Sequence, residues 1–407
     1  MPGTTTGTAR TTAARPRAIT LSLLCALALT AGACGAATPA TPGGTGPGTS
    51  GHGASYQPAR AVTASPSPSP RSSSPPVQLV VEASGDLLIH SPVWERALAL
   101  GGGRHYNFAP LFARVRPYIT SAGLPLCHLE TPLTPGPPSS YPVFNTPPEL
   151  AKAIHQTGWR ACSTASNHTL DQGQRGVGDT LRALNRAGVR HTGSYGSAAQ
   201  RARPLIMTVQ GVRVALLAYT EFTNGIPLPH PWSVNLASAA RIIADARRAR
   251  ADGAQIVIVN LHWGDEYVAW PSHYQWQLAR RLTRSPAIDA IVGQHAHVVQ
   301  PIRFVNGKPV VFGEGNLISN QTAACCPAAT QDGMIVLLTF VVRGRSVQVT
   351  KVRYVPVWVR HPDFEVLPAG TAWRNDRAHA AELRASYRRT VAVVGRGPRI
   401  QPVPARL

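Results

Sequence analysis

The sequence predicts an α/β protein with an at least partly parallel sheet, on three observations. Short apolar segments with strand character alternate with segments of helical spacing from Val77 onward. Several of the apolar segments run directly into Asp, Glu, Asn or His, as at ligand sites beside the carboxyl ends of parallel strands. Apolar residues make up 43% of the 407 residues, enough for a large core, so a wholly disordered chain is excluded.

The first half of the folded region alternates strands and helices. The apolar strand 77–83 leads into Gly85 and Asp86, and the helical spacing of 176–187 is expected to end at Gly188, because glycine favours the position after a helix. The expected elements are strand 77–83, helix 108–119, strand 123–129, helix 148–157, strand 159–164, helix 176–187 and strand 212–219.

The second half continues the alternation and then adds consecutive strands. The segment 255–261 is a continuous apolar run, typical of a strand buried on both faces. The expected elements are helix 237–251, strand 255–261, helix 273–283 and strand 287–292, followed by strands 308–313, 333–342 and 346–355 and a helix-like segment 376–389.

The N-terminus has the features of an export signal. Arginines up to Arg17 precede an uncharged, mostly apolar run at 18–31, which is too short to span a bilayer comfortably. The run ends in Ala-Gly-Ala before Cys34, which suits an ordinary signal peptidase and also resembles a bacterial lipoprotein box. We expect residues 1–33 to be a signal peptide and favour lipidation of Cys34 over soluble secretion or an uncleaved anchor. In each case the folded part of the chain lies on the extracytoplasmic side of the membrane.

Residues 34–76 are expected to form a disordered tether. They are mostly Ala, Thr, Gly, Pro and Ser, so too few large apolar side chains are present to offset the entropy of ordering. The predicted organisation is therefore a signal peptide (1–33), a tether (34–76), a folded domain (77–360) and a peripheral C-terminal extension (361–407).

The chain is strongly basic, with a formal charge of +21. From Val77 onward, 35 Lys and Arg stand against 19 Asp and Glu, which leaves +16. Such a surface attracts anionic polymers, phosphate groups or anionic lipid. Because no zinc-finger spacing, RNP-like aromatic motif or basic heptad helix accompanies the charge, no nucleic-acid partner is expected.

The cysteines leave two questions open. Cys127 and Cys162 each end a short apolar segment, and they form a disulfide if their strands are neighbours or two buried thiols if they are not. Cys325 and Cys326 lie in a loop and either pair with each other or stay unpaired. None of them has the paired spacing of a structural zinc site.

Carboxylates, amides and imidazoles collect at the predicted strand ends. A single His is more often satisfied or exposed than a ligand, but the repeated placement predicts a metal or phosphate site. The pair His295 and His297 should project to one side of an extended segment. These side chains suit Mn²⁺, Fe, Zn²⁺ or Mg²⁺ and not a thiolate-seeking metal. The candidates are Asp86, His90, Glu130, Asn167, His168, Asp171, His262, Asp265, Glu266, His295, His297 and Asn316.

Six motifs carry these candidates, in the order Gly85-Asp-Leu-Leu-Ile-His90, Leu129-Glu-Thr-Pro132, Ser166-Asn-His-Thr-Leu-Asp171, His262-Trp-Gly-Asp-Glu266, Gly293-Gln-His-Ala-His297 and Gly313-Glu-Gly-Asn316. Over roughly residues 77–359 the chain resembles the CapA family of poly-γ-glutamate capsule synthesis, which is related to calcineurin-like metallophosphoesterases. The resemblance implies an α/β/β/α sandwich of that type and one or two divalent metal ions.

The resemblance also implies a role for each candidate. Asp86 and His297 would bind a first metal, Glu130 would bridge, and Asn167, His262 and His295 would hold a second metal. His168 would protonate a leaving group, with Asp171 as its orienting partner. His90, Asp265, Glu266 and Asn316 are additional candidates.

Three positions depart from the pattern of the wider superfamily. Leu88 occupies the place of a metal-binding His, so the first metal site is poorer by one ligand. His128 stands where the CapA family usually has Asn, and Glu130 stands where related phosphoesterases have a shorter Asp. One metal, or a weakly held pair, is therefore expected.

Two classes of function compete. The first is a metal-dependent hydrolase that acts on a phosphate- or amide-containing envelope substrate. The second is a tethered, non-catalytic accessory protein that binds anionic poly-γ-glutamate during its synthesis or export. The resemblance implies a membrane-bound polyglutamate synthetase as a partner, and a lipid anchor would hold the chain at the membrane.

Overall fold

The computed structural model describes residues 75–407. The predicted signal peptide 1–33, the lipidation site Cys34 and all but the last two residues of the tether lie outside the described residues, so these stay predictions. Among residues 75–407, no helix combines the length and the apolar character needed to cross a membrane.

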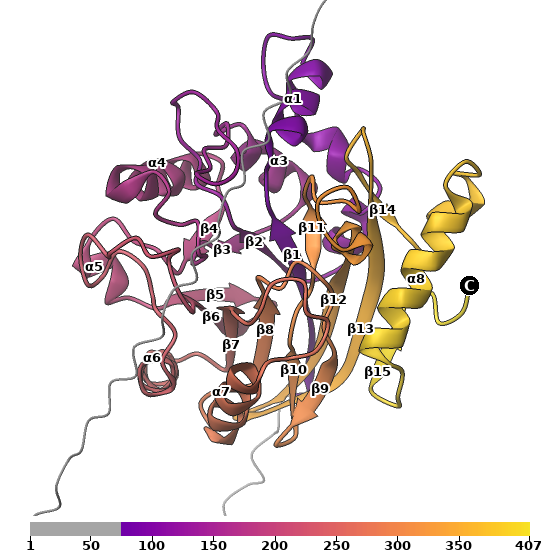
Figure 1. Ribbon diagram of the computed structural model, residues 1–407. Helices are drawn as coiled ribbons and strands as arrows, with labels where there is room; N and C mark the ends of the chain where they lie inside the picture. The colour runs from indigo at the N-terminus through magenta and orange to yellow at the C-terminus, as the bar shows by residue number, and fades with distance from the viewer. Residues whose placement is uncertain (1–74) are drawn as a thin grey trace, which may run out of the picture. The chain divides into compact units, whose positions relative to one another are not determined.

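Two β-sheets form the centre of the described chain (Figure 1). The larger sheet has nine strands, and the path through it runs β14 (Glu365–Pro368), β13 (Ser346–Arg360), β12 (Asp332–Arg343), β1 (Val77–Leu87), β2 (Leu124–Leu129), β3 (Ala161–Ser163) and β4 (Arg190–Thr192), with β11 (Asn316–Ile318) beside β1 and β15 (Ile400–Pro402) beside β13. The smaller sheet has six strands, in the order β5 (Leu205–Val209), β6 (Val212–Thr220), β7 (Ile256–His262), β8 (Ala290–Gln294), β10 (Lys308–Val311) and β9 (Ile302–Val305).

Both sheets contain a parallel half. Strands β1 to β4 pair in parallel, as do β6, β7, β8 and β10, whereas β12, β13 and β14 add antiparallel pairs. The predicted α/β fold with a partly parallel sheet is confirmed. The carboxyl ends of the parallel strands are the places where the predicted motifs begin.

Helices cover the outer faces of both sheets. The helices α1 (Ser91–Leu100), α2 (Arg116–Thr120) and α3 (Leu150–Thr157) share one core cluster with the larger sheet, and α6 (Ala239–Ala251) and α7 (His273–Arg284) share another with the smaller sheet. A third cluster, with residues such as Val81 on β1 and Ile258 on β7, contains side chains from both sheets and lies between them. The layers therefore follow the predicted α/β/β/α sandwich.

Local sequence signals explain several helix boundaries. Helix α7 begins after Ser272, whose hydroxyl accepts from the backbone of Gln275, while the Gln275 side chain accepts from Ser272 N. Helix α4 (Gly173–Arg186) ends just before Gly188, whose φ of +77° favours glycine, as predicted.

The expected single helix 108–119 is wrong. The segment instead forms the short 3-10 turn η1 (Ala109–Phe112) and the five-residue α2. Pro117 lacks the N–H that would continue the helix, and its ring clashes with the preceding turn. Pro110 can only begin a turn, for the same reason, so each proline starts a separate short element.

Residues 361–407, predicted as a peripheral extension, lie at the edge of the larger sheet and pair with it. Both β14 and β15 hydrogen-bond to β13. Helix α8 (Ala380–Val394) packs Leu383 and Tyr387 against Trp358 and Leu367. Arg389 on this helix forms two hydrogen bonds to Asp332 at the start of β12.

The alternative left open at Cys127 and Cys162 is resolved as a disulfide. The two residues face each other across the parallel pair β2–β3. Cys325 and Cys326 are both free thiols in the loop after β11.

Candidate metal centre

Six of the predicted ligands come together at the carboxyl ends of strands from both sheets. Asp86 lies near the end of β1, Glu130 follows β2, and His262 ends β7. The remaining three, Asn167, His295 and His297, come from the loops after β3 and β8. All six are buried, with at most 3% of their surface exposed.

Glu130 and Asp86 face imidazoles across short gaps. Glu130 Oε1 lies 3.8 Å from Nε2 of His262 and 3.8 Å from Nε2 of His297. Asp86 Oδ2 lies 3.3 Å from Nδ1 of His297. In the sets Asp86–Glu130–His297 and Glu130–His262–His295, all donor atoms lie within 4.8 Å of one another. The first set contains the residues expected at the first metal together with the bridging Glu130, and the second contains Glu130 with two of the three residues expected at the second metal.

The predicted second-metal group is linked by direct contacts. Asn167 Oδ1 accepts a hydrogen bond from His262 Nε2 at 2.8 Å. Nδ1 of His295 lies 3.1 Å from the same nitrogen. Asn167 is itself held by its Nδ2, which donates to Asn224 Oδ1 at 3.2 Å.

Several of these buried donor atoms have no hydrogen-bond partner among the described residues. They are Asp86 Oδ1, both carboxylate oxygens of Glu130, and His262 Nδ1. A buried carboxylate without a partner is unfavourable unless a cation compensates it. The donor chemistry therefore fits a divalent metal ion held between these side chains.

Burial and neighbouring charges shift the pKa values of the imidazoles in different directions. Burial lowers the pKa of His295 to about 3 and that of His262 well below its usual range, so both are neutral and keep a lone pair for an ion. Burial also acts to lower the pKa of His297, but the carboxylates of Glu130 and Asp86 outweigh it and raise that pKa to about 9. Burial also raises the pKa of Glu130 well above its usual range, so without a metal both Glu130 and His297 favour holding a proton.

The backbone that carries His295 and His297 is not the extended segment that the sequence suggested. Both residues have positive φ values, 91° and 55°. Residues other than glycine rarely adopt a positive φ. This conformation costs on the order of 1 kcal/mol per residue or more, and it recurs at functional sites. The turn nevertheless brings both imidazoles to the cluster, with ring centres 5.8 Å apart.

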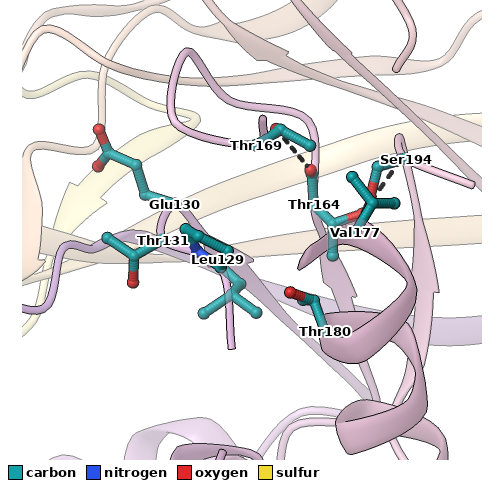
Figure 2. A pocket seen from close by; sticks show the side chains of 9 residues that line it. Leu129, Glu130, Thr131, Thr164, Thr169, Val177, Thr180 and Ser194 are labelled. Atoms are coloured by element: carbon teal, nitrogen blue, oxygen red, sulfur yellow. Dashed lines mark hydrogen bonds between the residues drawn. The ribbon is translucent and has the colours of Figure 1, made fainter. Parts of the chain in front are cut away.

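Hydroxyl groups fix the loop that presents Asn167 and His168. Figure 2 shows Thr169 and Thr164 joined by a hydrogen bond, and Thr164 joined to Ser194, to the right of Glu130 in this view. The Glu130 carboxylate points away from this group of hydroxyls (Figure 2). Ser166 Oγ also donates to the carbonyl of Glu130 at 2.6 Å, so the two ligand-bearing segments are tied together.

The predicted acid and its partner form a pair at the rim. His168 Nδ1 lies 2.8 Å from Asp171 Oδ2, which also accepts from Phe144 N at 2.7 Å. The Phe144 ring meets the His168 ring edge-on at 4.7 Å. With Nδ1–H donated to Asp171, the Nε2 atom of His168 is left to give or accept a proton.

The four additional candidates differ in their position relative to the ligand groups. Asn316 accepts from His297 Nδ1 at 3.0 Å and so orients that ligand. Glu266 is exposed but has a carboxylate oxygen near His295 and His297. His90 instead accepts from Asn320 N and lies against Phe144, and neither it nor the exposed Asp265 belongs to a described ligand group.

Sequence reasoning did not select His128 as a ligand. It lies on β2 directly beside Asp86 on β1, is fully buried, and stacks on His262 with ring centres 4.8 Å apart. The available signal was its position two residues before Glu130, which places both side chains on the same side of the strand. Burial lowers the pKa of His128 to about 4, so this imidazole is also neutral.

Residues 80–321 match the protein family described as "Bacterial capsule synthesis protein PGA_cap". The chain is 28% identical over 237 residues to the capsule biosynthesis protein CapA of Bacillus anthracis, covering 54% of this chain and 57% of that protein. It is 30% identical over 180 residues to the PGA biosynthesis protein CapA of Bacillus subtilis, covering 44% and 47%. The chain thus spans about half the length of the curated relatives it matches.

Among solved structures, the chain is similar to the calcineurin-like phosphoesterase YfkN from Bacillus subtilis, with a TM-score of 0.45 and 15% identity over 77% of this chain and 100% of that chain. It is also similar to a phosphatase from Mycoplasma pneumoniae, with a TM-score of 0.44 and 11% identity over 69% and 94%. Similarity at this level carries no information on the activity of this chain.

Proposed function

Because this chain belongs to the bacterial capsule synthesis protein PGA_cap family, as its resemblance to CapA proteins predicted, we propose that it is an exported accessory protein of poly-γ-glutamate synthesis or export. In this proposal Cys34 is lipidated and holds the chain on the extracytoplasmic face of the membrane, beside a polyglutamate synthetase. The candidate metal centre holds one or two divalent ions. Support comes from the family match and from the names of the relatives, one of which is a probable polyglutamine synthesis accessory protein of Mycobacterium tuberculosis.

The observation that carries the metal proposal is the set of buried donor atoms without partners among residues 75–407. Asp86, Glu130, His262, His295 and His297 would hold the ions, and Asn316 would orient His297. Their mixture of carboxylates and imidazoles favours Zn²⁺, Mn²⁺ or Fe²⁺ over Mg²⁺, which prefers all-oxygen surroundings. When bound, such ions lower the pKa of a coordinated water and polarise a phosphoryl or carbonyl oxygen.

Hydrolysis of a phosphoester or amide is the catalytic form of this proposal. His168 lies beside the cluster with Nδ1 committed to Asp171, so its Nε2 is the atom that would deliver a proton to a leaving group. Burial of the cluster excludes bulk water from the ligands, which strengthens every charge interaction there.

A non-catalytic role remains the second candidate, because the described head is strongly basic. A basic surface would hold a polyanion by long-range attraction that weakens with salt. However, the exposed Glu266 has a carboxylate oxygen near His295 and His297, so the rim of the metal centre carries an acidic side chain. A polymer bound by charge alone would therefore lie away from that rim.

The deciding experiment measures metal content. The full chain is purified without a polyhistidine tag, beside a His295→Ala/His297→Ala double variant, and both are analysed for transition metals. One to two equivalents are expected in the wild type, and fewer in the double variant. Activity on model phosphoesters and on poly-γ-glutamate, with the metal found, then separates the catalytic from the non-catalytic form. A wild type that neither contains nor takes up Mn²⁺, Fe²⁺ or Zn²⁺ would refute the metal centre.

Anchoring is tested separately. Cells that express the wild type or a Cys34→Ala variant are labelled with a fatty-acid analogue and fractionated. Label and membrane association are expected for the wild type alone. Equal distribution of the two proteins between membrane and medium would contradict the lipid anchor.

A further inference from the structure

His128 and Asp86 face each other across two neighbouring parallel strands. Asp86 on β1 is the register partner of His128 on β2. His128 Nε2 lies 3.7 Å from Asp86 Oδ1, and His262 Nδ1 lies 3.9 Å from the same oxygen. All three side chains are buried, with at most 1% of the residue surface exposed.

These three atoms are the unsatisfied ends of their side chains. Asp86 Oδ1, His128 Nε2 and His262 Nδ1 have no hydrogen-bond partner within the part of the chain that the structure describes. A separation of 3.7 Å or more is too long for a hydrogen bond, so they do not satisfy one another. Three buried polar atoms that converge without bonding indicate that something else binds between them.

The opposite ends of both rings are already engaged. His128 Nδ1 is hydrogen-bonded to Ser163 Oγ on the next strand, β3. His262 Nε2 faces the side-chain amide oxygen Oδ1 of Asn167, which can only accept a hydrogen bond, so this nitrogen carries the proton. The lone pair of neutral His262 is then on Nδ1, the atom that faces Asp86. Imidazole ligands of metals are usually fixed through their second nitrogen in this way.

The spacing fits a shared ion. Nitrogen and oxygen donors lie about 2.0–2.2 Å from Zn²⁺, which places neighbouring donors about 3.3–3.6 Å apart in tetrahedral or trigonal arrangements. The observed 3.7 and 3.9 Å exceed this by a few tenths of an ångström. Small side-chain rotations therefore suffice to close the set around an ion.

We infer that His128 is a metal ligand, and that Asp86 Oδ1, His128 Nε2 and His262 Nδ1 together form one ion position. This inference rests on the proposed metal centre and extends it. His128 supplies from β2 the imidazole that Leu88, the buried aliphatic residue directly after β1, does not supply. Two imidazoles and one carboxylate select Zn²⁺, Fe²⁺ or Mn²⁺ and disfavour Mg²⁺.

This position changes the expected division of the ligands. Asp86 directs Oδ1 to His128 and His262, whereas its Oδ2 faces His297 Nδ1, the nitrogen that donates to Asn316. A neutral imidazole coordinates through one nitrogen only, so His262 is used by the first position. Glu130, His295 and His297 remain for the second.

The test compares metal stoichiometry and coordination in the full-length protein and its variants. His128→Gln keeps a polar side chain of similar length, and Ser163→Ala removes only the group that orients His128. His191→Gln on β4 is the matched control, because that imidazole pairs with Asn185 away from the cluster. Each protein is stripped, reloaded with Zn²⁺ or Co²⁺ and analysed by elemental analysis and by the visible absorption of Co²⁺.

His128→Gln is expected to lose about one equivalent of metal and to change the Co²⁺ spectrum. Ser163→Ala should retain the ion with an affinity about 10- to 100-fold lower, the usual effect of removing such a supporting group. His191→Gln should match the wild type. If circular dichroism shows that His128→Gln misfolds, NMR of the Co²⁺-loaded wild type still tests whether His128 is a ligand. The Nδ1 proton of a coordinated His128 must then appear among the paramagnetically shifted imidazole resonances. Ser163→Ala must change the position of that resonance.

The experiment distinguishes failure of the role of His128 from failure of the metal centre. Full metal content and an unchanged Co²⁺ spectrum in folded His128→Gln would overturn the role of His128 while leaving the metal centre intact. A wild type without metal would overturn the metal centre itself.

Discussion

Glu130 Oε1 lies 3.8 Å from His297 Nε2, and neither oxygen of this buried carboxylate accepts a hydrogen bond from any residue in 75–407. The two side chains are therefore close enough for charge attraction but do not form a hydrogen-bonded ion pair. His297 compensates Glu130 and Asp86 by holding a proton, since these carboxylates outweigh burial and raise its pKa to about 9. A divalent ion would replace that proton and satisfy the carboxylates together.

Glu130→Gln is expected to reduce the stabilisation that metal confers on the wild type. An ion present at a thousand times its Kd adds about 4 kcal/mol to the free energy of unfolding, and the amide removes the charge on which binding depends. The measurement is thermal unfolding with metal and with chelator for wild type, Glu130→Gln and Glu149→Gln, whose carboxylate is exposed on the surface. An equal metal-dependent gain in Glu130→Gln and in the wild type would exclude Glu130 as a ligand.

Metal affinity should rise steeply with pH between about 7 and 9. Below its raised pKa, His297 holds a proton that the ion must displace, so each pH unit is expected to raise the apparent affinity about tenfold. Above about pH 9 the proton is already lost and the slope should vanish. Chelator-buffered Zn²⁺ titrations at several pH values measure this, and the proton released on binding is measured by calorimetry in buffers of different ionisation enthalpy. An affinity that is constant from pH 7 to 9 would show that His297 is neutral before the ion binds.

Under the hydrolase form of the proposal, His168→Gln should separate activity from metal binding. His168 contacts Asp171 and Phe144 but supplies no donor atom to a described ligand group. Loss of a general acid lowers turnover about 100-fold or more, while the metal content should match the wild type. The control is Asp171→Asn, which keeps His168 but weakens its orientation and should give a smaller loss. Metal loss in His168→Gln would instead make it a ligand.

Much of the fold was predictable because local chemistry and global packing agree. The Val- and Ile-rich segments before Asp86 and His262 had to be buried strands, and alternation with helices required parallel pairing. The single helix expected at 108–119 failed because periodicity was weighed without the two prolines that interrupt it. Non-local facts, such as the pairing of β15 with β13, leave no local signal.

The sequence predicted which residues gather at the candidate site, but not the backbone turn and the strand register that place them. Strand ends brought Asp86, Glu130, His262 and His297 together as expected. The backbone turn at His295, with a φ of 91°, could not be foreseen, because a non-glycine residue gives no sign of positive φ. His128 became visible as a neighbour of Asp86 only when the register between β1 and β2 was known.

Gly85→Ala should disrupt the site from the backbone. A Cβ atom at Gly85 would lie 2.0 Å from the carbonyl oxygen of Gly315, so β1 and β11 would have to separate. Because Asp86 N donates to that same carbonyl at 3.0 Å, the shift would move a proposed ligand. We expect a loss of about 2 kcal/mol or more of stability and weaker metal binding. Gly397→Ala, where an added Cβ meets nothing within 4 Å, is the control and should be close to neutral. Unchanged metal affinity in Gly85→Ala would mean that the site tolerates movement of β1.

Glu82→Gln should make the protein less sensitive to pH. Glu82 is fully buried on β1, and burial raises the pKa of its carboxyl to about 8, against partly opposing hydrogen bonds from Ser84 and from Leu126 N. Between the unfolded pKa near 4.5 and about 8, the folded protein holds a proton that the unfolded chain releases. The contribution of Glu82 to stability therefore falls by about 1.4 kcal/mol for each pH unit in this window.

A glutamine can accept from Leu126 N and donate to Ser84 Oγ, so it reproduces the neutral acid without a titrating proton. The variant should match the wild type near pH 4.5 and exceed it by a few kcal/mol at pH 8, as measured by denaturant unfolding followed through tryptophan fluorescence. The difference between the two proteins cancels the titration of every other group, so a difference that does not grow with pH would mean that Glu82 is ionised in the folded state.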